Sequence, residues 1–101
     1  MDVVTHVDRF NAAVLSGDWA TFVDALHPDA VMTFTGVPFG PYEGREAIAA
    51  AYTSNPPTDT MRIVANHGNG RIDFVWSRGG TGTLALDYAD DQVIGMQITF
   101  P

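Results

Sequence analysis

Asp87 is a candidate catalytic base because of the residues around it in the sequence. It lies two residues after Ala85 and four after Thr83, so the three side chains share one face of an extended strand. The small side chain of Ala85 would leave room for a ligand on that face. If the face lines an apolar cavity, a poorly solvated carboxylate is a stronger base that can remove a proton next to a carbonyl group. The alternative is that Asp87 lies in solvent at the end of its strand.

Two hydroxyl groups are the matching proton donors. Tyr52 follows three alanines at positions 49–51 on the helix face expected to meet the sheet, so its phenol should point into the interior. A buried phenol needs a hydrogen-bonding partner and can donate to a substrate carbonyl. Thr83, on the face of Asp87, is the second candidate, and either donor would stabilise a developing enolate. The alternative for Tyr52 is a packed side chain that bonds to the backbone.

Five large apolar side chains are candidates for the wall of a binding cavity: Trp19, Phe34, Phe39, Trp76 and Met96. Pockets for small molecules are usually lined by such side chains. Each of them could equally belong to an ordinary core. Together, large side chains that face the small alanines of the chain predict a cavity for a small, flat, hydrophobic molecule.

Cofactor and metal sites lack their usual sequence signals. The three histidines lie on separate predicted elements, with no His-x-His or HExxH spacing, and the chain has no cysteine. The glycine-rich segments GVPFGPYEG and SRGGTG have neither Walker nor dinucleotide-binding spacing and are typical of turns. We therefore predict no cofactor and no metal.

The charge balance bears on partners and location. Twelve acidic residues against five basic ones give a net charge of −7, so the summed field repels nucleic acid and anionic membranes. The chain has no run of about 18 apolar residues and no basic, then apolar, leader at its start. Together with the lack of cysteine, this predicts a cytoplasmic protein.

The predicted elements divide the chain into a helical part and a strand part. Apolar residues at helical spacing predict helices over 2–16, 18–26 and 45–54, with a break at 27–29, a strand over 30–35 and a glycine- and proline-rich elbow over 36–41. Alternation between turn signals predicts strands over 60–66, 71–77, 83–88 and 92–100.

This order predicts one α+β domain over residues 1–101, in which N-terminal helices pack on the concave face of a curved, mostly antiparallel sheet. Both faces of the sheet are predicted to be apolar. Because the second face needs a cover, we expect a homodimer through the outer face of the sheet.

Three motifs carry a resemblance to a known family: FNAAVLSGDWATFVDALHPDAV, GPYEGREAIAAAY and GTLALDYADDQVIGMQITF. In their order and spacing they resemble the SnoaL-like branch of the nuclear transport factor 2 superfamily, the cystatin-like cone shared with ketosteroid isomerase, in a shortened form. The resemblance implies a cone-shaped fold, an apolar pocket between helices and sheet, and frequent dimers. It does not imply one activity, because this fold serves many chemistries.

The resemblance does not extend to the isomerase site. Phe34 stands where ketosteroid isomerases carry the carboxylate base, and Phe10 where they carry the tyrosine of the oxyanion hole. Their second aspartate falls near Thr83. Only the supporting tyrosine is matched, by Tyr52.

Three functions therefore remain as hypotheses. The leading one is a cofactor-free enzyme of the SnoaL-like type that abstracts a proton and isomerises or cyclises a hydrophobic, polyketide-like carbonyl compound, with Asp87 as base and Tyr52 or Thr83 as donor. The alternative is a non-catalytic module that binds a small hydrophobic ligand or serves as a dimeric scaffold. The third, epoxide hydrolysis, requires Asp73 to face the cavity beside Arg71.

Overall fold

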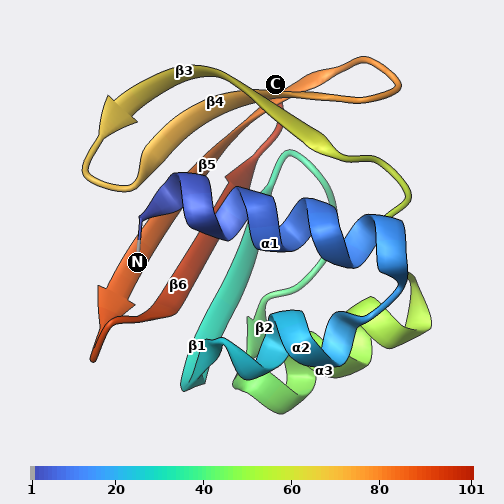
Figure 1. Ribbon diagram of the computed structural model, residues 1–101, viewed down its shortest axis with the longest axis vertical. Helices are drawn as coiled ribbons and strands as arrows, with labels where there is room; N and C mark the ends of the chain where they lie inside the picture. Colours follow the sequence, from blue (N-terminus) through green and yellow to red (C-terminus); the bar gives the residue numbers. More distant parts are fainter. Residues whose placement is uncertain (1) are drawn as a thin grey trace.

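A single curved sheet of six strands forms one layer of the protein (Figure 1). The structure, a computed structural model, describes residues 2–101. Along the sheet the strand order is β2-β1-β6-β5-β4-β3, and the pairing is antiparallel except between β1 and β6, which run parallel. The strands are β1 (Leu26–Thr35), β2 (Tyr42–Glu43), β3 (Met61–Gly68), β4 (Arg71–Trp76), β5 (Thr81–Ala89) and β6 (Gln92–Thr99). The predicted α+β class and the mostly antiparallel sheet are confirmed.

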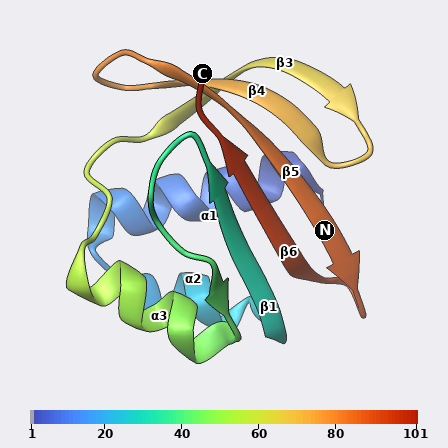
Figure 2. The ribbon, with the colours of Figure 1, turned by 180° about the vertical axis from the view of Figure 1, so that it is seen from behind.

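Three helices form the second layer and cover one face of the sheet (Figure 1 and Figure 2). They are α1 (Val3–Ser16), α2 (Trp19–Asp24) and α3 (Arg45–Ser54). The side chain of Asp2 accepts a hydrogen bond from the backbone N–H of Thr5 and so begins α1, and Gly17 ends it in the left-handed conformation. Asp18 caps α2 in the same way, so the predicted helix boundaries at this turn are confirmed. Among the described residues, no helix is long and apolar enough to cross a lipid bilayer.

The core lies between the helices and the concave face of the sheet. Strands β4, β5 and β6 each turn alternate large side chains toward the helices, and these are buried: Ile72, Phe74, Leu84, Leu86, Met96 and Ile98. From α1, Asn11 fixes the start of β3. Its side-chain amide donates to the carbonyl of Met61, and its side-chain oxygen accepts from the N–H of Met61, both at 2.8 Å. These two hydrogen bonds join α1 to β3 and place the linker between α3 and β3 beside the sheet.

The outer face of the sheet is more polar than the sequence predicts. Residues paired in register share a face, and the pairs Thr33 with Gln97, Thr83 with Thr99 and Thr35 with Thr99 all lie on the side away from the helices. Most of these side chains are exposed or half-buried. A homodimer through this face stays a prediction.

Strand β1 begins four residues earlier than predicted, at Leu26, and passes through Pro28. The register of β1 against β6 shifts between Leu26 and Val31, and proline is accepted at such an irregularity because no ladder hydrogen bond is required of it there. At this bulge, ring nitrogen Nδ1 of His27 accepts the backbone N–H of Asp29 at 3.0 Å.

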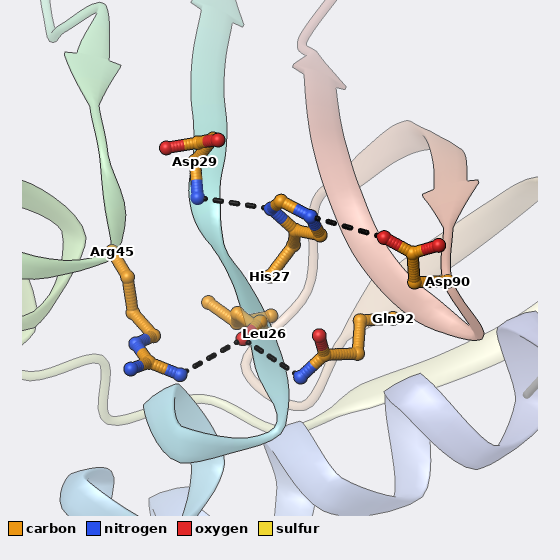
Figure 3. A network of polar contacts seen from close by, with 6 residues as sticks. All are labelled: Leu26, His27, Asp29, Arg45, Asp90 and Gln92. Carbon is orange, nitrogen blue, oxygen red and sulfur yellow. Dashed lines mark hydrogen bonds and ion pairs between the residues drawn. The ribbon is translucent and has the colours of Figure 1, made fainter.

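A small polar network fixes this end of β1 to its neighbours (Figure 3). The carbonyl oxygen of Leu26 accepts one hydrogen bond from Nη1 of Arg45 at 3.2 Å and another from Nε2 of Gln92 at 3.3 Å. Nε2 of His27 lies 3.7 Å from a carboxylate oxygen of Asp90. The start of α3 and the β5–β6 turn are thereby tied to the start of β1, and the other end of β1 leads into the elbow at 36–41.

Gly82 lets β5 pass directly over the most deeply buried ring, and this makes it a test of the core. A Cβ atom at Gly82 would lie 2.5 Å from Cζ of Phe74, whose side chain is fully buried and cannot move away. We expect Gly82→Ala to lower the free energy of unfolding by about 1–3 kcal/mol, the usual cost of overpacking a core. Urea denaturation measures it. The control is Thr83→Val on the exposed side of the same strand, and equal stability of the two variants would contradict this packing.

Candidate functional site

An apolar hollow rich in aromatic side chains opens between β1, the elbow, α3 and the end of β4. Its volume is about 400 Å³. Its wall consists of four phenylalanine or tryptophan side chains, two tyrosines and a rim of small and polar residues: Met32, Phe34, Phe39, Tyr42, Ala51, Tyr52, Asn55, Pro56, Pro57, Thr58, Trp76 and Phe100. We refer to this hollow as the aromatic pocket. A lining of this kind is typical of pockets for small hydrophobic molecules.

A second, smaller hollow continues the aromatic pocket into the cone. It measures about 70 Å³ and shares four wall residues with the aromatic pocket: Phe34, Tyr52, Pro57 and Trp76. Beyond them it reaches Phe10 of α1, Met61 of β3 and Ile98 of β6. A small cavity with such an apolar wall holds no water and can take only an apolar group. The aromatic pocket therefore has an open outer part and a narrow inner end.

The rings of this wall come from separate parts of the chain. Phe34 lies next to the last residue of β1, and its ring is nearly parallel to that of Phe100, with centroids 6.4 Å apart. Trp76 ends β4 and lies 6.3 Å from the same Phe100 ring. Phe39, in the elbow, meets Phe34 edge-on at 6.2 Å and is 53% exposed, so it stands at the mouth. The backbone N–H of Phe100 donates to the carbonyl of Thr35, which fixes the chain end against the elbow.

Tyr52 is the polar group deepest in the wall. Its ring stacks on Trp19, with centroids 4.4 Å apart and planes 10° apart. Its hydroxyl donates to the sulfur of Met32 at 3.3 Å, and a thioether is a weak acceptor. Burial raises the pKa of the Tyr52 phenol far above its usual value, because the phenolate would be desolvated. Tyr52 therefore remains a proton donor in neutral solution and has a poor partner within the protein.

Four of the residues predicted for a ligand site meet in the aromatic pocket: Tyr52, Phe34, Phe39 and Trp76. Trp19 and Met96, predicted as wall residues, line none of the hollows described here. Trp19 lies behind Tyr52, among the rings of the helical layer, and Met96 is buried in the sheet's core. For these two side chains the alternative interpretation, ordinary core, fits the geometry.

Asp87 and Thr83 lie on the opposite face of the sheet from the aromatic pocket. Leu84 and Leu86 fill the concave side of β5, so Thr83, Ala85 and Asp87 point outward; Thr83 and Asp87 are exposed and Ala85 is half-buried. The carboxylate of Asp87 lies over Gly95, where a Cβ atom would come within 2.9 Å of its Oδ2. The condition set for Asp87 as a base, that its face lines an apolar cavity, is not met, because the two leucines bury more apolar surface on the concave side. The alternative, a solvent-exposed Asp87, fits the geometry.

Arg71 and Asp73 also lie on the outer face. They line a hollow of about 230 Å³ together with His67, and Nε2 of His67 lies 2.9 Å from Oδ2 of Asp73. The condition set for epoxide hydrolysis, Asp73 facing the apolar cavity beside Arg71, is therefore not met: the two residues are together but on the wrong side of the sheet.

Several wall residues escaped sequence reasoning. Met32 lies within β1, where its pattern indicates only a strand, and Tyr42, Asn55 and Pro57 lie at or beyond the ends of elements, where their patterns indicate only a short strand or a stop signal. Phe100 reaches the pocket because β6 runs parallel to β1 and brings the end of the chain to the elbow. An aromatic residue at the end of the last predicted strand was a signal for Phe100, but it could be interpreted only with knowledge that β6 pairs in parallel with β1.

Three helices packed on one face of a curved sheet, with an apolar pocket beside them, define a fold class that serves many functions. The chain belongs to the SnoaL-like domain family, whose sequence pattern matches residues 7–95. None of the curated proteins matches it in sequence.

Solved structures agree on the fold. A protein from Sphaerobacter thermophilus is 18% identical, with a TM-score of 0.71 over 100% of this chain and 97% of the other. A proposed polyketide cyclase from Pseudomonas putida KT2440 is 14% identical, with a TM-score of 0.67 over 100% and 92%. A computationally designed binder of 17-OHP is 9% identical, with a TM-score of 0.73 over 98% and 90%. At these identities the likeness concerns the fold alone.

Proposed function

We propose that this protein binds a small, flat, hydrophobic carbonyl compound in the aromatic pocket. The observation that carries the proposal is the pocket itself, about 400 Å³ of space with a wall of aromatic rings and one buried donor. The size is that of typical ligand sites. The fold also supports it, since a designed protein of the same architecture is a ligand binder.

Tyr52 gives the ligand its orientation. Its hydroxyl points to the thioether of Met32, and both groups line the pocket. A carbonyl oxygen is a stronger acceptor than a thioether, so a ligand that brings one to this point improves the hydrogen bond of a buried donor. The flat part of the ligand then lies among Phe34, Trp76 and Phe100.

Binding is better supported than proton abstraction followed by isomerisation or cyclisation. The polar side chains in the described wall are Tyr42, Tyr52, Asn55 and Thr58, and a tyrosine, amide or hydroxyl is a poor base at neutral pH. The carboxylate of Asp87 lies beyond the sheet. Enzymatic chemistry of the kind suggested by the name of the Pseudomonas putida neighbour would need a base that this wall lacks.

Nile red, a neutral, flat dye with one carbonyl group, tests the proposal. We expect it to bind with a blue-shifted, enhanced fluorescence, and Tyr52→Phe to weaken binding about two- to tenfold, the worth of one neutral hydrogen bond. Asp87→Asn, on the far face, is the matched control and should bind the dye as the natural sequence does. Absence of dye binding, or loss of binding in Asp87→Asn with Tyr52→Phe unaffected, would overturn the proposal.

A further inference from the structure

Six aromatic side chains surround the aromatic pocket, and they come from four separate parts of the chain: Phe34, Phe39, Tyr42, Tyr52, Trp76 and Phe100. The face of an aromatic ring is electrically negative because of its quadrupole. A cation close to such a face is attracted to it, and the attraction grows when the cation leaves water. Leucine, isoleucine and valine could line an apolar pocket as well, but they would not attract a cation in this way.

The charges around the pocket also favour a positively charged ligand. Among the described residues of its wall there is no arginine, histidine, aspartate or glutamate. The sequence contains no lysine, its five basic residues are all arginines, and its net charge of −7 gives a field that attracts cations. An anionic ligand would enter against this field and would find no charged partner in the wall.

A carboxylate adjoins the pocket on the side of Trp76. Asp59 lines a neighbouring hollow of about 220 Å³ together with Pro57, Thr58 and Trp76, and these three also belong to the wall of the aromatic pocket. Oδ1 of Asp59 is buried and makes no hydrogen bond, although Nε of Arg78 lies 3.0 Å from it as an ion pair. The side chain of Arg78 is 73% exposed, so solvent weakens its hold on this carboxylate.

We propose that the ligand of the aromatic pocket carries an onium group, a quaternary or protonated tertiary amine, held against the aromatic faces at the mouth. This inference rests on the proposed function and adds the charge of the ligand to it. The uncharged part of the molecule lies deeper, toward Tyr52 and Met32. The cation lies near Phe39 and Trp76, where Asp59 adds a negative charge from the adjoining hollow.

Three probes of different charge test the inference: phenyltrimethylammonium, its neutral isostere tert-butylbenzene, and the anion 4-tert-butylbenzoate, which adds a carboxylate to the same skeleton. Each competes with Nile red for the natural protein. We expect the cation to bind about tenfold more tightly than the neutral probe, as a partly desolvated cation–π contact allows, and the anion to bind most weakly. The preference should shrink as salt concentration rises.

Two variants separate the aromatic effect from the general field. Trp76→Leu keeps an apolar wall but removes one ring, so it should weaken the cation severalfold and change the neutral probe less. Arg78→Gln removes the positive charge nearest Asp59 and should strengthen the cation about two- to threefold, without effect on tert-butylbenzene. Arg62→Gln, on the exposed side of β3, is the control and should change neither probe.

The outcomes distinguish this inference from the function on which it rests. If Nile red binds but the neutral probe competes as well as the cation, or better, the onium proposal is wrong and the pocket still binds hydrophobic molecules. If neither Nile red nor any of the three probes binds, both proposals fail. A cation preference that Trp76→Leu leaves untouched would also overturn the aromatic assignment.

Discussion

Ala51→Phe is expected to weaken Nile red binding at least about 30-fold, or roughly 2 kcal/mol, while the protein stays folded. Ala51 is half-buried on α3 and lines the aromatic pocket directly before Tyr52. A phenyl group at this position would project into open space instead of into a packed core, so it would occupy the volume that a ligand needs. Fluorescence titration measures the affinity, and circular dichroism verifies the fold.

Ala50→Phe is the matched control, since Ala50 precedes Ala51 on the same helix and is exposed. The two variants add the same group one position apart, which is about 100° around a helix. We expect Ala50→Phe to bind the dye normally. Equal loss of binding in both variants would mean that α3 responds to any added bulk, and normal binding in both would place the dye elsewhere.

The sequence predicts the helical part of this fold well because its signals are local. The caps at Asp2 and Asp18, the glycine at position 17 and the alanine run before Tyr52 act within a few residues of where they stand. The strand over β1 was predicted too short because Pro28 was interpreted as a stop, whereas it lies in a bulge whose partner, β6, is more than sixty residues away.

The side of the sheet on which Asp87 lies was predictable from its neighbours. Strand alternation places Thr83 and Asp87 on one face and Leu84 and Leu86 on the other, and the leucines bury the greater apolar area. The hypothesis of Asp87 as a base required its face to line the cavity, and the support for this was the room left by Ala85, a weaker signal. Burial of the larger apolar set decides such a choice.

The pocket wall itself could be predicted only in part. Phe34, Phe39 and Trp76 were identified as large apolar residues that could line a cavity, but so was Trp19, which the structure places behind Tyr52. The packing of α3 and the elbow against the sheet decides which rings line the pocket. The sequence pattern does not predict this packing. Phe100 depends on the parallel pairing of β1 with β6.

His6 is expected to make the protein lose stability as the pH falls from about 6.5 to about 4. The side chain is 4% exposed, in the core, with its ring 5.3 Å from that of Phe22. Burial, and to a smaller extent the positive charge of Arg9, together lower the pKa of His6 from 6.5 to about 4. The imidazole is therefore neutral in the folded protein at neutral pH.

The sign of the effect follows from proton uptake. Between these two pKa values the unfolded chain protonates His6 and the folded protein does not, so lowering the pH favours the unfolded state. The stability is fully present above pH 6.5 and is lost as the pH falls through the folded pKa, by about 3 kcal/mol in total. Asp2 and Asp18 have pKa values lowered by their hydrogen bonds to Thr5 and Thr21, so their contribution is lost at lower pH than this window.

His6→Leu should remove this dependence, because leucine fills the same buried space without a titratable group. Urea denaturation at pH 7.5, 6.0, 5.0 and 4.5 compares the slopes of stability against pH, so a change in overall stability does not affect the test. His67→Gln, at an exposed histidine on β3, should retain the slope of the natural sequence. If His6→Leu retains it as well, the acid sensitivity arises elsewhere, and the desolvated imidazole of α1 is not its cause.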